Sequence, residues 1–165
     1  MAKHIEHSWT LPADPAAVFA MLTDESFQRA ARDAAAAVTV SATVAEEGPD
    51  TVLHTVRTMS TEGVPSAFKS MIGDRLEIVI EQRWGAAASD GTRTGTMHLE
   101  VRGKPVTFDG PCSLTPGGEG SQLTVAGDVR CTLPLVGGRV ESVVAPALLQ
   151  GFKVEEQQGR VYLGR

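Results

Sequence analysis

Two histidines are the side chains of this sequence best suited to acid–base or hydrogen-bonding chemistry. His7 and His54 each fall on the more apolar face of a segment in which apolar and polar residues alternate. A neutral imidazole on the inner face of a sheet can orient a ligand or act as a general base. The alternative is a core or rim histidine that hydrogen-bonds to a neighbour, and a single β-bulge would invert the assignment of faces. His4 and His98 fall on polar faces, where we expect them to be solvated.

A second set of candidates consists of large side chains that could line an apolar cavity. Its members lie on inner faces of predicted strands, on the predicted last helix, or in the irregular segment 60–74: Trp9, Phe68, Met71, Trp84, Met97, Phe108, Ala147 and Gly151. Simple core packing is the alternative, although core side chains also form the walls of any cavity. Gln82 follows an inner position and is either a hydrogen-bonding group for a ligand or a residue at the rim.

These residues depend on one long amphipathic helix, predicted over most of residues 134–164. At 100° per residue, its apolar face holds Val140, Val143, Val144, Ala147, Leu148, Gly151, Val154, Val161 and Tyr162. The opposite face holds Ser142, Lys153, Glu156 and Arg160, with Leu149 as the exception. Such a helix needs a broad apolar surface, which a curved sheet would provide. Pro146 predicts a kink or break near Ala145, and Gly151 predicts a close approach to the sheet.

Seven segments with a period of two supply that sheet. They are residues 3–11, 38–44, 51–59, 75–84, 93–102, 106–115 and 122–133. Asp14 and Pro15 start the first of two short helices after the first strand. Segment 60–74 has no such period but carries apolar residues, so we expect a short helix or flap over the sheet's edge, with a hinge at Gly73. The chain shows no repeat or linker, and residues 1–165 are predicted to form one domain.

Composition limits the kinds of partner. The formal net charge of −5 and an aromatic content of 5% argue against nucleic acid and anionic membrane surfaces. No apolar run has the roughly 20 residues of a membrane span, and the first residues do not form a signal peptide. We therefore expect a cytoplasmic protein without stable membrane insertion. Cys112 and Cys131 are expected to be buried and unpaired, with Cys112 opposite about Thr124.

No metal or cofactor motif is present in the sequence. The spacing of its residues matches no hydrolase elbow, phosphate loop, zinc site or dinucleotide fingerprint. The glycines at 117, 118 and 120 are interpreted as a hairpin turn, and those at 137 and 138 as the start of a helix. We predict no metal and no cofactor.

The order of elements resembles the SRPBCC superfamily, also called Bet v 1/START-like or helix-grip. The opening IEHSWTLPADPAAVFAMLTD is similar to the superfamily's first strand, Pro-containing turn and helix, and LPLVGGRVE to the Gly-rich start of its last helix. More narrowly, the chain resembles the actinobacterial DUF2505 family. The resemblance implies an α+β fold in which an antiparallel sheet of about seven strands curls round the C-terminal helix. It also implies a cavity, which in the superfamily holds lipids, sterols or polyketides.

Three functions remain open at this stage. The first is binding of an apolar small molecule, lipid or polyketide-like, without catalysis. The second is a cyclase- or dehydratase-type enzyme that uses His7 or His54, although cyclases of the superfamily tend to use pocket Tyr, Arg or Trp and the one tyrosine, Tyr162, lies near the C-terminus. The third is a protein-interaction module with a filled core. The residues leave catalytic groups, ligand identity and oligomeric state unassigned.

Overall fold

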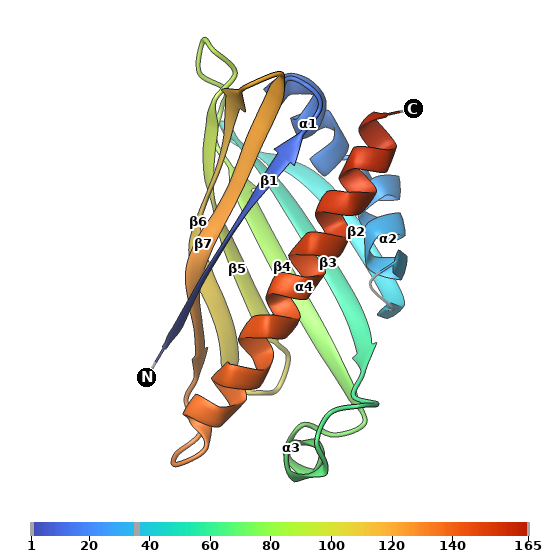
Figure 1. The fold of residues 1–165 in the computed structure, drawn as a ribbon, viewed down its shortest axis with the longest axis vertical. Helices are drawn as coiled ribbons and strands as arrows, with labels where there is room; N and C mark the ends of the chain where they lie inside the picture. The colour runs from blue at the N-terminus through green and yellow to red at the C-terminus, as the bar shows by residue number, and fades with distance from the viewer. Residues whose placement is uncertain (1, 35–36, 165) are drawn as a thin grey trace.

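A curled antiparallel sheet partly encloses one long helix (Figure 1). The computed structural model describes residues 2–34 and 37–164. In chain order the elements are β1 (Lys3–Leu11), α1 (Pro15–Leu22), α2 (Glu25–Ala34), β2 (Ala37–Glu47), β3 (Asp50–Ser60), α3 (Ser66–Ile72), β4 (Arg75–Trp84), β5 (Arg93–Val101), β6 (Val106–Gly117), β7 (Gly120–Cys131) and α4 (Gly137–Leu163). The predicted α+β architecture, with seven strands, two short helices after the first strand and a long last helix, is confirmed.

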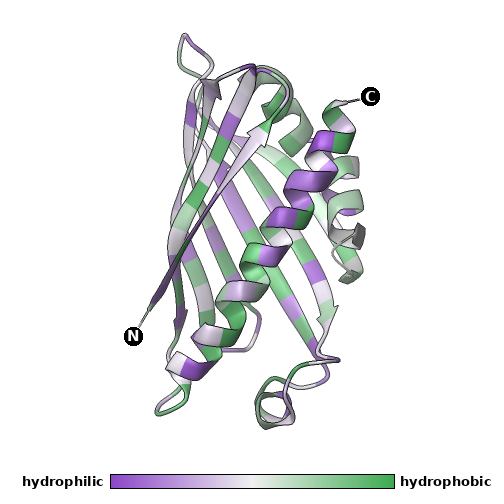
Figure 2. Cartoon of the chain, in the orientation of Figure 1, coloured by the Kyte–Doolittle hydropathy of each residue, from purple (hydrophilic) through white to green (hydrophobic). Residues whose placement is uncertain are grey.

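The strands follow one another across the sheet except at one place. The order is β1-β7-β6-β5-β4-β3-β2, so the first strand pairs with the last. Much of the sheet alternates between hydrophobic and hydrophilic residues along its strands, as the banding in Figure 2 shows. In the inner rows, Trp9 of β1 lies opposite Leu123 of β7, which in turn lies opposite Leu114 of β6. This alternation directs one set of side chains towards α4 and the other towards solvent.

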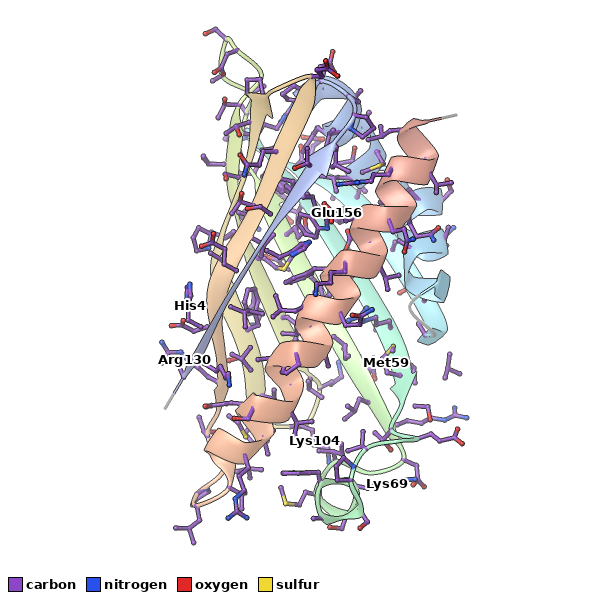
Figure 3. All side chains as sticks on the ribbon, viewed as in Figure 1. His4, Met59, Lys69, Lys104, Arg130 and Glu156 are labelled. Carbon is purple, nitrogen blue, oxygen red and sulfur yellow. The ribbon has the colours of Figure 1, made fainter. Side chains whose placement is uncertain are left out.

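The outer face carries the two histidines that we expected to be solvated. His4 Nδ1 lies 2.9 Å from Asp128 Oδ1, and its side chain is 63% exposed. Figure 3 shows His4 on the side of the sheet away from α4. His98 is paired with Asp109 on the same outer face.

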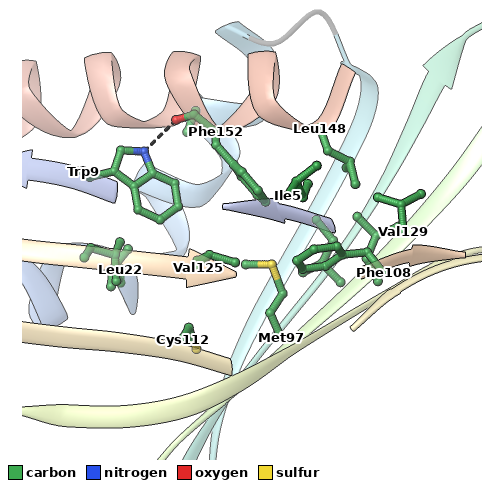
Figure 4. Packing of buried hydrophobic residues seen from close by; sticks show 14 of the residues in the cluster. Ile5, Trp9, Leu22, Met97, Phe108, Cys112, Val125, Val129, Leu148 and Phe152 are labelled. Atoms are coloured by element: carbon green, nitrogen blue, oxygen red, sulfur yellow. Dashed lines mark hydrogen bonds between the residues drawn. The ribbon is translucent and has the colours of Figure 1, made fainter. Parts of the chain in front are cut away.

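The upper half of the groove between sheet and helix is filled by aromatic side chains. The indole N–H of Trp9 donates to the carbonyl oxygen of Phe152 on α4 at 2.6 Å (Figure 4). The Phe152 ring lies 5.5 Å from the Trp9 ring and 6.3 Å from the Phe108 ring, both in edge-on geometry. Trp84 and Met97 are also buried in this cluster. Aromatic rings bury large areas, so this half of the core leaves little space.

The face that α4 buries differs from the predicted one. Its buried residues are Gly137, Val140, Glu141, Ala145, Leu148, Phe152, Glu155 and Gly159. Val143 and Val161, which we expected inside, are 38% and 58% exposed. Two acids on the buried side account for the error, because acids are rarely buried without a partner. Glu141 has one here: its carboxylate accepts the backbone N–H of Cys131 at 2.9 Å.

The predicted kink or break at Pro146 is wrong. Helix α4 is continuous from Gly137 to Leu163, and Figure 1 shows it without a sharp bend. Pro146 and Ser142 are both exposed. Because proline has no backbone N–H, the carbonyl of Ser142 has no donor within the helix. This carbonyl lies on the solvent side, where water can replace the missing bond.

In the second half of α4, the glycine that allows close packing is Gly159 rather than Gly151. A Cβ at Gly151 would meet nothing within 4 Å, whereas one at Gly159 would lie 3.2 Å from Met21 Cε and 3.4 Å from Leu11 Cδ2. The predicted role of Gly151 in a close approach to the sheet is therefore wrong. The same substitution at the two positions should therefore affect the free energy of unfolding differently.

We expect Gly159→Leu to lower the free energy of unfolding by about 1–3 kcal/mol through overpacking. Gly151→Leu should leave it unchanged or raise it by up to about 1 kcal/mol, because glycine is a poor helix former. Urea unfolding followed by circular dichroism measures both. Equal destabilisation by the two variants would contradict this packing of α4.

The two cysteines are free and buried, as predicted. Cys112 lies opposite Val125, one residue from the predicted Thr124. Burial raises the pKa of the Cys112 thiol to about 12, compared with about 8.5 for an accessible cysteine. The folded state thus favours the protonated thiol, and this stabilisation is lost as pH rises above about 8.5 towards 12.

Alkylation tests this prediction directly. At pH 8, iodoacetamide should modify Cys112 in the folded protein on the order of a thousandfold more slowly than in urea-unfolded protein, because only the thiolate reacts. Peptide mass spectrometry separates Cys112 from Cys131. Rapid modification of native Cys112 would show that β6 is not packed as described.

Candidate functional site

A cavity of about 240 Å³ lies in the lower half of the groove. Its sheet wall includes Ile78, Leu99 and Val106 from β4, β5 and β6. Its second wall is the N-terminal half of α4, and the residues that line it there include Val140, Val144 and Leu148. Aliphatic side chains face one another here in place of the aromatic rings of the upper half. These side chains are too small to fill the groove, so an apolar space remains.

The third wall is the segment around α3. Val64, Phe68 and Ile72 of this segment line the cavity. None of the residues of α3 is fully buried, and Figure 1 shows the helix at the lower end of the molecule, away from the main body of the sheet. The short helix expected within residues 60–74 is thus confirmed.

The α3 segment is closed at its base by hydrogen bonds. The backbone N–H of Thr61 donates to the carbonyl of Asp74 at 3.1 Å, and the Thr61 hydroxyl donates to the carbonyl of Gly73 at 2.6 Å. Gly73 ends the helix with φ +82°, a conformation that glycine adopts without strain. The segment is therefore a compact loop with joined ends, and its position over the cavity depends on few contacts.

Three polar side chains also line the cavity: Arg57, Ser60 and Lys104. Sequence reasoning missed both cations. The alternation that places His54 on the inner face puts Arg57 on the outer face, but Arg57 is buried and lies opposite Ile78, an inner residue of β4. Leu53 lies on the same face of β3 as Arg57 and is also buried. The presence of a leucine on that face was the signal available in the sequence.

Two of the predicted site residues line the cavity. Phe68 contributes from α3 and Ala147 from α4. Met71 lies on α3, and its carbonyl accepts a hydrogen bond from the Lys104 ammonium at 3.2 Å. Gly151, one turn beyond Ala147, is not among the residues that line the cavity.

The other apolar candidates belong to the filled half of the core. Trp9, Trp84, Met97 and Phe108 are buried there and do not line the cavity. Gln82 is also buried, and its side-chain oxygen accepts the indole N–H of Trp84 at 3.0 Å. That amide oxygen therefore has a partner within the protein.

The two histidines do not come together. His7 lies on the inner face as predicted, but it packs against α4, with its ring 6.4 Å from that of Phe152 and its Nε2 atom 3.6 Å from Glu156 Oε1. His54 lies on the outer face, opposite Thr43 and Glu81. Its predicted position on the inner face is wrong, because β3 carries apolar residues on both faces and the pairing with β4 decides which face is inside. Neither histidine lines the cavity.

The arrangement of acids, histidines and cysteines offers no metal site in residues 2–34 and 37–164, where no group of three such side chains could hold an ion. Over the same residues, no helix combines the length and apolarity needed to cross a bilayer. The feature of the described structure best suited to a ligand is thus the apolar cavity with its two cations.

Several solved structures have a fold similar to that of this chain. The Zhui aromatase/cyclase from Streptomyces sp. R1128 superposes with a TM-score of 0.62 at 13% identity, over 100% of this chain and 95% of that one. A STAR-related lipid transfer protein from Xanthomonas axonopodis gives 0.60 at 13% identity, over 98% and 86%. Norcoclaurine synthase from Thalictrum flavum gives 0.58 at 12% identity, over 100% and 88%.

These similarities show the fold alone, which is the helix-grip fold of the SRPBCC superfamily. No functionally curated protein matches the chain in sequence. The family model described as "Protein of unknown function (DUF2505)" matches residues 6–163. The match extends over nearly the whole chain, from β1 to the end of α4, and the chain therefore belongs to the DUF2505 family.

Proposed function

We propose that this protein binds an apolar small molecule in the cavity between β3–β6, α3 and the first half of α4. The observation that carries the proposal is the aliphatic lining of an unfilled space of about 240 Å³. Transfer of a ligand's methylene group from water into such a space contributes roughly 0.8 kcal/mol. Ligand pockets usually measure about 300–1,000 Å³, so the ligand is small or displaces α3 outward.

Two features support binding at this place. The fold is shared with a protein named as a lipid transfer protein and with an aromatase/cyclase, whose names refer to apolar or aromatic molecules. The wall formed by α3 is also the part of the cavity with the weakest attachment, since its described bonds to the rest of the chain are few. A ligand can therefore enter by movement of α3, without disturbance of the aromatic core.

Binding without catalysis fits the cavity better than an enzyme does. The polar side chains among its described lining residues are Arg57, Ser60 and Lys104, a set that includes no histidine or carboxylate to act as a general base. His7, the candidate base that the structure keeps on the inner face, lies against Phe152 outside the cavity. The proposed role is thus to hold or carry the molecule.

Filling the cavity tests the proposal. Val144→Phe adds a ring to the α4 wall and should abolish binding of an apolar probe such as 1-octanol, measured by titration calorimetry. The matched control is Val161→Phe, the same change on the same helix at a site that is 58% exposed and outside the cavity. We expect the control to bind as the unmodified protein does, with both variants folded by circular dichroism.

The proposal is wrong if the unmodified protein takes up no apolar probe. It is also wrong if Val144→Phe and Val161→Phe bind equally well, since the site would then lie elsewhere. Native mass spectrometry of the purified protein provides an independent check, because a co-purified small molecule should disappear in Val144→Phe and persist in Val161→Phe.

A further inference from the structure

We propose that the ligand is an amphiphile with an anionic head, a carboxylate at the end of a short apolar chain, and that Lys104 binds the head group. This inference rests on the proposed function and names the class of ligand. It is based on the position of one ammonium group within an otherwise largely aliphatic lining.

The backbone fixes the place from which Lys104 reaches the cavity. Lys104 lies in the turn between β5 and β6, where its N–H donates to the carbonyl of Val101 at 3.0 Å and Gly103 has φ +73°. The side chain is half-buried and extends from this turn to α3, where Nζ donates to the carbonyl of Met71. Figure 3 shows Lys104 at the lower end of the molecule, next to α3.

The charge of Lys104 has no carboxylate partner among the described residues. The ion pairs of the described chain do not include Lys104, and its lining neighbours include no Asp or Glu. An ammonium has three donors, and one of them binds the Met71 carbonyl. The remaining donors can serve an anion held in the cavity.

The surroundings favour an anion over a neutral polar group. A hydrogen bond between an ammonium and a carboxylate is roughly twice as strong as one between neutral groups. Apolar walls also lower the local dielectric constant, which strengthens the attraction relative to water. A ligand with a neutral hydroxyl in place of the carboxylate gains the same apolar contacts and can accept from the ammonium, but it lacks the attraction between opposite charges.

The volume favours a short chain. The cavity of about 240 Å³ is smaller than the roughly 300–1,000 Å³ of most ligand pockets. Octanoate is therefore the suitable probe, and 1-octanol is its neutral analogue of the same length.

The experiment compares sodium octanoate with 1-octanol by titration calorimetry at pH 7.5, on three forms of the protein. The unmodified protein should bind octanoate about tenfold more tightly than octanol, because one charge-assisted hydrogen bond corresponds to at least that factor. Lys104→Met should lose this preference and still bind octanol, because the aliphatic lining is retained. Circular dichroism shows that the variant is folded.

Lys69→Met is the matched control. Lys69 lies on α3 and is half-buried like Lys104, but it does not line the cavity, so its removal subtracts the same charge from the same end of the molecule. The control should keep the tenfold preference for octanoate. Loss of preference in both variants would indicate a diffuse charge effect and would overturn the assignment to Lys104.

The outcomes separate this inference from the proposed function. If octanol binds and octanoate binds no better, the anionic head group is wrong while the apolar site stands. If neither probe binds the unmodified protein, both proposals fail. If octanoate is preferred and Lys104→Met keeps the preference, the ligand class stands but the role of Lys104 is overturned.

Discussion

The contact between Trp9 and Phe152 fixes the place of the last helix on the sheet. The indole N–H donates to the Phe152 carbonyl at 2.6 Å, and the Phe152 ring packs edge-on against Trp9 and Phe108. These rings determine the separation of α4 from the sheet in the upper half of the groove. The same continuous helix then runs over valine and leucine side chains in the lower half. Because these are smaller than aromatic rings, the separation set above leaves a cavity below.

The walls of this cavity differ in how firmly they are held. At its start, α4 is bound to the sheet by the buried carboxylate of Glu141, which accepts the N–H of Cys131 at the end of β7. The sheet wall is held by the backbone hydrogen bonds of five strand pairs, which follow one another across the sheet from β2–β3 to β6–β7. The third wall, α3, has no fully buried residue. It is held by the bond from Lys104 and by the partly buried side chains of Phe68 and Met71, which pack against the core. Local opening is easiest where buried apolar contacts are fewest, which here is at α3.

The sequence was sufficient for the order of elements, because alternation with a period of two and the Asp14–Pro15 helix start are local signals. It was insufficient wherever a tertiary contact decides the outcome. The face of β3 follows from its pairing with β4, which places Arg57 inside and His54 outside. The buried face of α4 includes Glu141, whose partner lies on another element. The cavity depends on summed side-chain volumes across six elements, so the sequence placed Phe68 and Ala147 at it but missed Lys104.

Specificity in this fold must come from the few polar groups at the cavity, because aliphatic walls discriminate weakly between apolar ligands of similar size. The solved structures that share the fold are 12–13% identical to this chain, so their cavity linings carry no information about this one. In the described lining, Ser60 is neutral, Arg57 is buried within the sheet wall, and Lys104 extends to the segment that covers the site. Lys104 thus contacts both the site and its cover. A head group that binds the remaining donors of its ammonium shares Lys104 with the Met71 carbonyl, which connects recognition of the ligand to the attachment of α3.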